Sequence, residues 1–284
     1  MAQKKTTQKN TVVKDIKYYQ KKFWKLFFYT LGGVFLFFLF ASWGLFGAMP
    51  SFEDLENPES NLATEIISSD GVVLGKFYNE NRTAIKYKDL PKHLVDALVS
   101  TEDERFYDHS GIDAKRTFGA ALQLGSNGGA STLTQQLAKL LFHGEGSKFR
   151  PFRIVQKAKE WIIAIRLERQ YTKNEIIALY FNKVDFVNGA VGIRSAAKVY
   201  FNKEPRNLTI EESALLVGML TNPSRFNPNR FPERALTRRN IVLGQLVRNN
   251  HLEESAKAIL AKKPIKLDFH PESHLDGTAT YFRE

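Results

Sequence analysis

Three acidic residues, Glu102, Asp103 and Glu104, follow one another at the end of a segment with helical periodicity. Apolar residues before them, among them Leu94 and Leu98, recur at the spacing of one helix face. If the helix reaches Glu102, its carboxyl lies about 80° from Leu94, at the edge of the apolar stripe. Partial burial and the negative end of the helix dipole would raise its pKa, which suits a general base. The alternative is a solvated helix end.

A second acid, Glu160, lies in a segment of helical periodicity that covers residues 153–171. One apolar stripe of this segment comprises Ile154, Val155, Ala158, Trp161, Ile162 and Ile165. Glu160 lies opposite that stripe, beside Ile163 and Leu167, and a helix that is apolar on two sides is usually buried. We therefore expect Glu160 to be partly buried, and two such carboxylates in one cleft would suit glycosyl-transfer chemistry. The alternative is a structural ion pair with a lysine such as Lys157.

A glycine-rich segment lies between the two acids and precedes another predicted helix. Thr132 and Gln135 would open this helix through a capping box. Backbone N–H groups at a helix N-terminus after a glycine loop form a natural anion site. Positive charge follows in the sequence from Lys139, Lys148, Arg150 and Arg153. The alternative is a plain capped helix after a mobile loop, and the spacing excludes a P-loop because no Gly-Lys-Ser/Thr follows.

Three other segments have structural interpretations. Two β-rich runs around Asp70-Gly71 predict a β-hairpin. Residues 208–220 predict a capped core helix, in which Thr209 and Glu212 have the spacing of a capping box. Asn188-Gly189 predicts a turn, and helical periodicity dominates from Leu90 onward.

The positive charge of the chain is unevenly distributed. The net charge is +11, but residues 1–25 hold eight lysines and a single acid, Asp15, and supply most of it. The remainder contains no recognisable nucleic-acid module, so nucleic-acid binding is not expected. The absence of cysteine excludes disulfides, zinc-thiolate sites and thiol nucleophiles. The histidines form no metal-binding motif, so no structural metal is expected.

A long uncharged run, residues 26–49, follows the basic tail. About 20 apolar residues span a bilayer, and Trp24 and Trp43 near the ends suit the two interfaces. Lysines precede the run and acids follow it, which predicts a single-pass helix with a cytoplasmic N-terminus and the rest of the chain outside. A cleaved signal peptide is the alternative, but the run is too long and its end is a poor cleavage site.

Five motifs in order make the chain similar to a known family. They are EDERFYDHSG (102–111), GGASTLTQQLAK (128–139), KAKE (157–160), NEIIALYFNKVDFVNGAVGI (174–193) and ALLVGMLTNPSRFNP (214–228). Together they resemble the peptidoglycan glycosyltransferases, glycosyltransferase family 51, which include the N-terminal domain of class A penicillin-binding proteins. The resemblance covers about residues 60–260.

This resemblance implies a reaction and assigns roles. Lipid II would be polymerised into glycan strands with inversion at the anomeric carbon and release of undecaprenyl pyrophosphate. Glu102 resembles the family's catalytic base, which takes the proton of the acceptor 4-hydroxyl, and Glu160 resembles the second glutamate, near the pyrophosphate. The resemblance also implies that further residues of these motifs bind substrate: Asp103, Phe106, His109, Ser131, Thr132, Gln135, Gln136, Lys139 and Lys157.

The third motif departs from the family pattern. The family has Arg-Lys where this chain has Gln156-Lys157, so one positive charge is missing, and Arg153, about one turn earlier, is our candidate to replace it. The resemblance implies no tightly bound cofactor and allows for a divalent cation, Mg²⁺ or Mn²⁺, with the substrate pyrophosphate. It implies lipid II, the growing strand, membrane lipid and cell-wall synthesis proteins as partners, at the bacterial inner membrane with a periplasmic catalytic domain.

The fold that the resemblance implies is mainly α and lysozyme-like. It would have a large lobe and a smaller membrane-facing jaw, near residues 125–185, after one transmembrane helix and a short β-hairpin. The expected organisation is a cytoplasmic tail (1–25), a transmembrane helix (26–49), a linker (50–61), the glycosyltransferase domain (62–260) and the start of a connection to a transpeptidase domain (261–284).

The sequence is also compatible with two other functions, and it contains one motif of a different enzyme class. A lysozyme-like glycan-cleaving enzyme would share the fold, and a catalytically inactive, membrane-anchored scaffold would bind cell-wall machinery. The anchor and the lysine-rich loop region argue against the first, and the two glutamates argue against the second. Ser195 and Lys198 fit the S-x-x-K motif of penicillin-binding nucleophiles. No partner motif follows, so Ser195 is not expected to be a nucleophile.

Overall fold

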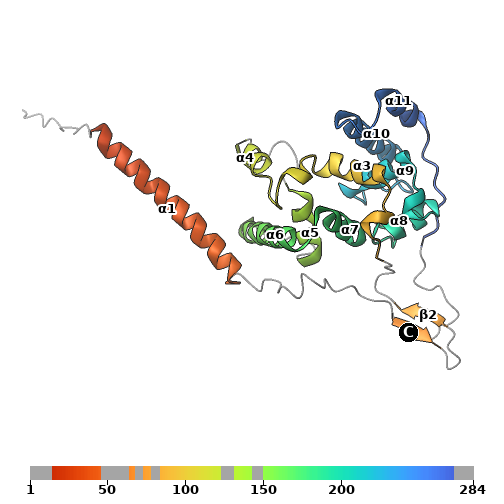
Figure 1. The fold of residues 1–284 in the computed structure, drawn as a ribbon, viewed down its shortest axis with the longest axis horizontal. Helices are drawn as coiled ribbons and strands as arrows, with labels where there is room; N and C mark the ends of the chain where they lie inside the picture. Colours follow the sequence, from red (N-terminus) through yellow and green to blue (C-terminus); the bar gives the residue numbers. More distant parts are fainter. Residues whose placement is uncertain are drawn as a thin grey trace, which may run out of the picture. The chain divides into compact units, whose positions relative to one another are not determined.

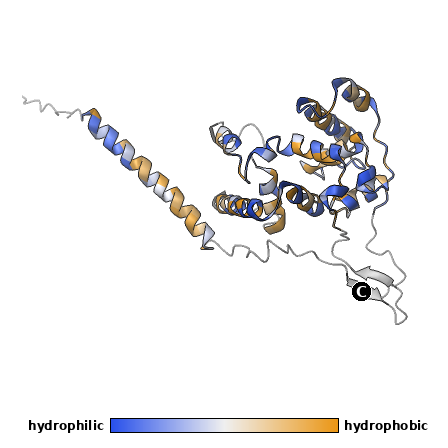
Figure 2. Cartoon of the chain, in the orientation of Figure 1, coloured by the Kyte–Doolittle hydropathy of each residue, from blue (hydrophilic) through white to orange (hydrophobic). Residues whose placement is uncertain are grey.

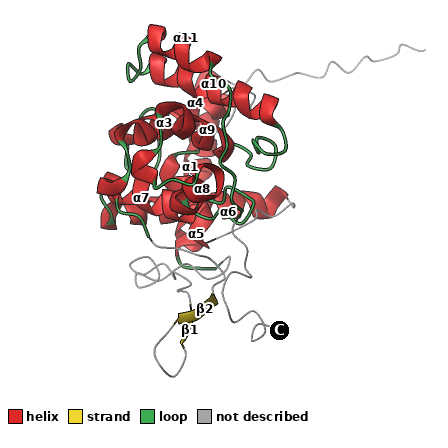
Figure 3. Cartoon of the chain, turned by 90° about the vertical axis from the view of Figure 1, so that its right-hand side faces the viewer, coloured by secondary structure: helices red, strands yellow, loops and turns green. Residues whose placement is uncertain are grey.

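Helices dominate the computed structural model, which describes residues 15–45, 64–67, 73–77, 84–122, 131–142 and 150–271. The chain divides into two units, residues 1–49 and 50–284. One two-stranded sheet accompanies the helices in the described part of the chain (Figure 3). The mainly helical fold class that the family resemblance implies is confirmed.

The first unit contains the long helix α1, Ile16–Ser42. The helix begins ten residues before the predicted apolar run, because the lysine and aromatic residues before that run are also compatible with a helix. It ends in a glycine turn, where Gly44 has a φ of 78° and Leu45 N–H donates to the carbonyl of Phe40. The predicted end at Met49 lies outside the described residues.

Helix α1 is long and apolar enough to cross a membrane. At about 1.5 Å per residue, its 27 residues span about 40 Å, more than the roughly 30 Å of a bilayer core. Figure 2 shows hydrophilic residues in its first part and hydrophobic residues in its second. The helix therefore has the polarity expected of a membrane anchor with a basic flank.

The predicted hairpin is confirmed in the second unit. Strands β1, Thr64–Ile67, and β2, Val73–Phe77, pair antiparallel, with Thr64 opposite Phe77. The register shifts between Ile66 and Ile67. The predicted turn at Asp70-Gly71 lies outside the described residues.

The helices of the second unit form two groups (Figure 1). Four of them pack together, with α10 in contact with each of the other three: α3 (Lys92–Glu102), α9 (Ile210–Leu220), α10 (Pro232–Arg248) and α11 (Glu254–Lys262). Helix α9 begins with the predicted capping box of Thr209 and Glu212, and its residues from Ser213 to Met219 are buried. The prediction of a capped core helix is therefore confirmed.

Three helices form the second group: α5 (Leu133–Phe142), α6 (Arg150–Gln170) and α7 (Lys173–Lys183). They fall within the range expected for the smaller lobe. Between and beside the two groups lie α4 (Ala114–Leu122), α8 (Ile193–Phe201) and the short 3₁₀ helices η1 (Tyr87–Asp89), η2 (Phe106–Asp108) and η3 (Pro205–Asn207). The segment from the end of α3 to the start of α5 connects the two groups, and it holds the first motif.

Candidate active site

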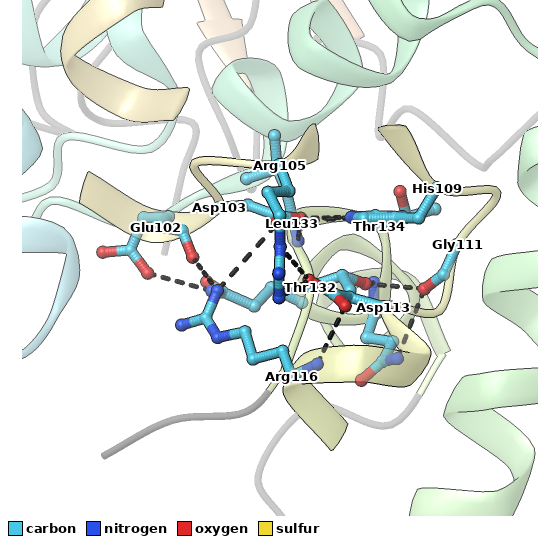
Figure 4. A network of polar contacts seen from close by, with 12 residues as sticks. Glu102, Asp103, Arg105, His109, Gly111, Asp113, Arg116, Thr132, Leu133 and Thr134 are labelled. Atoms are coloured by element: carbon cyan, nitrogen blue, oxygen red, sulfur yellow. Dashed lines mark hydrogen bonds and ion pairs between the residues drawn. The ribbon is translucent and has the colours of Figure 1, made fainter. Parts of the chain in front are cut away.

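Glu102 is the last residue of α3, so the predicted helix does reach it. Its Oε2 accepts a hydrogen bond of 2.9 Å from Nε2 of Gln136 on α5. Its main-chain carbonyl accepts a bond of 2.9 Å from Nη1 of Arg116 on α4 (Figure 4). The side chain is half-buried. The proposed base is therefore held through both its backbone and its carboxylate, by two neighbouring helices.

Asp103 connects the end of α3 to the start of α5. It is 1% exposed, and its Oδ2 accepts the backbone N–H of Leu133 at 2.9 Å. A carboxylate at this position compensates a helix N-terminus, where N–H groups lack partners. His109 Nε2 lies 3.1 Å from the same oxygen, an arrangement in which the imidazole donates to the carboxylate (Figure 4). Asp103 is therefore placed to fix α5 relative to Glu102.

Phe106 is fully buried beside these groups. Its ring lies edge-on to His109, and Lys173 Nζ lies 4.2 Å from the ring centroid on its face. The same ammonium donates to the main-chain carbonyl of His109 at 2.6 Å. Phe106 thus packs between His109 and Lys173 and supports the first motif from the interior.

Gly111 lies at a crowded position between helices. Its φ is +86°, and a Cβ there would lie 2.9 Å from the backbone of Ala164 on α6, so only glycine fits. Its carbonyl accepts bonds from Thr132 Oγ1, at 2.7 Å, and Gln135 Nε2, at 3.2 Å. The predicted capping box is therefore only half formed. Thr132 Oγ1 accepts from the Gln135 N–H, but the Gln135 side chain bonds to Gly111, because that buried carbonyl needs donors.

Glu160 is 8% exposed, which confirms the buried acid predicted on α6. The buried face of this helix is the one with Ile163 and Leu167, whereas Ile154 on the opposite stripe is 65% exposed. Lys157 Nζ donates to Glu160 Oε2 at 2.9 Å and to Ser131 Oγ at 2.7 Å. The ion pair that the sequence left as an alternative is thus present, and it links α6 to the start of α5.

A cavity of about 390 Å³ brings most of the predicted site residues together. It is lined by Ser131, Gln135, Gln136, Lys139, Arg153, Ile154, Gln156, Lys157 and Glu160. The lining residues include three cationic side chains, those of Lys139, Arg153 and Lys157, and one carboxylate, that of Glu160. The cavity therefore carries a net positive charge and suits an anionic group. Glu102 lies behind Gln136, one hydrogen bond from the cavity lining.

Some predicted features do not line this cavity. Asp103, Phe106 and Thr132 are buried, and His109 has 7% of its side chain exposed. The glycine-rich loop around 125–129 and Lys148 lie outside the described residues. Ser195 is buried inside α8 away from the residues of this cavity, which fits its rejection as a nucleophile.

Two residues at the site were missed by sequence reasoning. Arg116 follows the first motif on α4, where nothing in the pattern separates it from a solvated arginine. Tyr180 lies in the fourth motif, where its apolar neighbours on α7 made it indistinguishable from a core residue. In the structure Tyr180 OH donates to Gln136 Oε1 at 3.1 Å. Burial, together with the negative charge of Glu102, raises the pKa of Tyr180 far above its usual range.

The donor set of the cavity does not fit a cation held by protein alone. Glu160 is the one carboxylate among the lining residues, and its Oε2 already accepts from Lys157. Across the described residues, no group of three or more acidic, histidine or cysteine side chains is arranged to hold a metal. Mg²⁺ would require several oxygen ligands from elsewhere.

Comparison with known proteins assigns the family. A family profile described as Transglycosylase matches residues 70–247. The chain therefore belongs to the transglycosylase family, which confirms the resemblance carried by its five motifs.

Relatives of the chain include penicillin-binding proteins. It is 35% identical to penicillin-binding protein 1A of Pseudomonas aeruginosa over 85% of this chain, and 36% identical to penicillin-binding protein 1F of Bacillus subtilis over 73%. The chain spans 29% of the length of each of these relatives. It is also similar to the crystal structure of penicillin-binding protein 1A from Haemophilus influenzae, with 22% identity, a TM-score of 0.43, and coverage of 74% of this chain and 22% of that one.

Proposed function

We propose that this chain polymerises lipid II into peptidoglycan glycan strands by inverting glycosyl transfer, with release of undecaprenyl pyrophosphate. The observation that carries the proposal is the cavity of three cations and one buried carboxylate, one hydrogen bond away from Glu102. A transferase that expels a pyrophosphate needs positive charge for the leaving group and a base for the incoming hydroxyl. The family of the chain supports this pairing of groups.

Glu102 acts as the base in this proposal. Among the described residues, Gln136 bonds to Oε2, so Oε1 is the oxygen that takes the proton of the acceptor 4-hydroxyl. The attacking oxygen then forms the new glycosidic bond as the bond from the anomeric carbon to the pyrophosphate breaks. The proton stays on Glu102 until solvent removes it. General base catalysis of this kind contributes roughly 10²–10⁴-fold to a rate.

The cations of the cavity receive the leaving pyrophosphate. Lys157 is oriented by Glu160 on one side and Ser131 on the other, so its ammonium is held in place before the substrate arrives. Preorganised charge of this kind stabilises negative charge that develops in the transition state. Lys139 and the exposed Arg153 line the same cavity, and Arg153 supplies the charge that Gln156 lacks.

We propose that the reaction takes place at a membrane. The apolar helix α1 and the relatives of the chain fit a membrane-anchored protein. We further propose that the N-terminus is cytoplasmic, because lysines precede the apolar run and acids follow it. The catalytic domain would then meet the polyprenyl-linked substrate on the outer side, together with other cell-wall synthesis proteins and, in a longer chain, a transpeptidase domain.

The test uses the purified chain in detergent with labelled lipid II. We expect glycan polymer on a gel from the wild type, and a rate reduced by about 10²–10⁴-fold in Glu102→Gln. Glu104→Gln is the matched control, because Glu104 belongs to the same acidic run but is exposed, and it should polymerise normally.

The other outcomes each exclude part of the proposal. Binding of lipid II without polymer from any variant would favour an inactive scaffold. Turnover of finished peptidoglycan in place of lipid II would favour a glycan-cleaving enzyme. Polymer from wild type and Glu102→Gln alike would show that Glu102 is not the base.

A further inference from the structure

A line of hydrogen bonds crosses three helices and ends on the proposed base. Tyr180 OH on α7 donates to Gln136 Oε1 on α5 at 3.1 Å, and Gln136 Nε2 donates to Glu102 Oε2 on α3 at 2.9 Å. Tyr180 is 2% exposed, whereas Gln136 and Glu102 are half-buried. The line therefore runs from the interior, through Gln136 in the cavity lining, to Glu102.

The chemistry of the three groups determines the direction of this line. A primary amide has one end that accepts and one that donates, and a carboxylate only accepts. Glu102 therefore needs the NH₂ end of Gln136, which leaves the amide oxygen facing Tyr180. A donor is required there, and the raised pKa of Tyr180 keeps its hydroxyl protonated at any pH at which the enzyme works.

The position of the Tyr180 hydroxyl is fixed by its surroundings. Helix α7 begins with a complete capping box, in which Thr172 and Glu175 bond reciprocally. Phe181, next to Tyr180, is fully buried with its ring edge-on to that of Tyr180, and Asn182 bonds to both main-chain groups of Ile85. A hydroxyl on such a support has few alternative positions.

We propose that Tyr180 is a positioning residue for glycosyl transfer, whose hydroxyl holds the Gln136 amide in the orientation that donates to Glu102. The inference rests on the proposed function, in which Glu102 is the base. The bond to Oε2 orients the carboxylate so that Oε1 points to the acceptor hydroxyl, and it stabilises the charged form that can accept a proton. Tyr180 keeps its own proton throughout.

Other charged groups also lie near Glu102. Arg116 of α4 bonds to its main-chain carbonyl, and Asp103, which accepts from His109, is its neighbour in the chain. On the cavity side, Lys139, Lys157 and Glu160 lie beyond Gln136. Since a Tyr180→Phe substitution leaves all of these in place, a change in the pH profile of activity reports on the hydrogen-bonded line.

The experiment compares Tyr180→Phe with Tyr200→Phe. Tyr200 is a matched control because it is also fully buried, but its hydroxyl bonds to Phe186 and Asn188. The rate of lipid II polymerisation is measured against pH and substrate concentration. In Tyr180→Phe we expect kcat to fall by about tenfold with little change in KM, because the Gln136 amide is no longer held in the orientation that donates to the charged Glu102. The acid limb of the kcat profile should move to higher pH, because the carboxylate loses a donor.

Several results would overturn the inference. Wild-type kcat and an unmoved acid limb in Tyr180→Phe would do so, as would equal losses in both variants with no shift in the limb, since these indicate a packing effect. If Tyr180→Phe does not fold, Gln136→Met, which cannot donate to Glu102, must show the shifted limb, and an unmoved limb there overturns the inference. Absence of polymer from the wild type would instead defeat the proposed function, so the two failures are distinguishable.

Discussion

Helices α9 and α6 are both packed into the second unit, but they bury different kinds of side chain. Helix α9 buries a run of seven small or apolar residues, from Ser213 to Met219. Helix α6 buries Ile163 and Leu167 but also two charged residues, Lys159 and Glu160, each 8% exposed. Lysine and glutamate are almost never fully buried unless they are paired.

This difference separates residues that stabilise the fold from residues that prepare the site. Burial of the apolar face of α9 is favourable in itself, at roughly 25 cal/mol per Å². Burial of the charged groups of α6 is not, because desolvation offsets much of the attraction between the partners. We infer that the acid on α6 is retained for the cavity that it lines, where it holds Lys157 toward the space that an anion would occupy.

The largest expected effect follows from neutralising the buried acid. Glu160→Gln should reduce lipid II polymerisation by at least about 10²-fold, because Lys157 loses the carboxylate that orients it. Thermal unfolding should change little, since glutamine fills the same volume and Lys157, with 39% of its side chain exposed, stays solvated.

Glu254→Gln is the matched control for this substitution. Glu254 also pairs with a lysine three residues away, Lys257, at 2.8 Å, but it lies on α11 with 67% of its side chain exposed. Its activity should equal that of the wild type. If Glu160→Gln unfolded the protein and left the remaining folded molecules fully active, the contrast between α6 and α9 would be wrong.

The second prediction concerns the apolar helix. Leu216→Ala on α9 should lower the free energy of unfolding by about 2–5 kcal/mol, because it removes a fully buried side chain and leaves a cavity. Urea denaturation measures this loss. The specific activity per folded molecule should stay within a factor of about two, since Leu216 does not line the site. A large loss of activity at full folding would connect α9 directly to the chemistry.

The two helices also differ in how far the sequence predicts them. The spacing of Thr209 and Glu212 and the apolar run behind them are sufficient for α9, because the signals are local. For α6 the periodicity predicts a helix and two apolar stripes but does not select the buried one. That choice depends on the helices that contact α6, α5 and α7, and in the structure Ile163 and Leu167 are the buried residues.

At the site, too, the sequence predicts local features but not contacts between distant helices. The sequence predicts Glu102 at a helix end and Glu160 in a buried position, and both are found there. It assigns Thr132 and Gln135 to one capping box, whereas the Gln135 side chain reaches the carbonyl of Gly111, 24 residues away. Contacts of this range, like that of Tyr180 with Gln136, depend on how the helices are arranged and leave no local pattern.

A smaller effect is expected at the exposed edge of the cavity. Arg153→Ala should lower the rate of polymerisation by about tenfold, because one of three cations that face the pyrophosphate is lost. Gln156→Arg in the same protein should restore most of the rate by returning the family's charge to α6. Arg169→Ala, an exposed arginine at the end of the same helix, is the control. Full activity of Arg153→Ala would contradict the role of Arg153.

The smallest expected effect is on the pH dependence of the free energy of unfolding, through Asp113 between the first motif and α4. Asp113 precedes α4, where it accepts from the Arg116 N–H at 2.9 Å and pairs with Arg105 at 2.7 Å. Burial acts to raise the pKa of Asp113, but the Arg116 N–H and the Arg105 guanidinium together outweigh it, so the pKa lies below its usual value. At neutral pH, Asp113→Asn should therefore unfold more easily, by about 1 kcal/mol.

The sign of the pH dependence tests this assignment. Because the folded-state pKa of Asp113 is depressed, the unfolded chain binds the proton more readily, and the carboxylate stabilises the fold at pH values above its unfolded pKa. That contribution disappears as the pH falls through the folded pKa, so urea midpoints of wild type and Asp113→Asn should converge below about pH 4. Asp268→Asn, which alters a 61% exposed carboxylate, should have the urea midpoint of the wild type at every pH. A gap that stayed constant or widened on acidification would mean that the charge of Asp113 does not stabilise the connection between the first motif and α4.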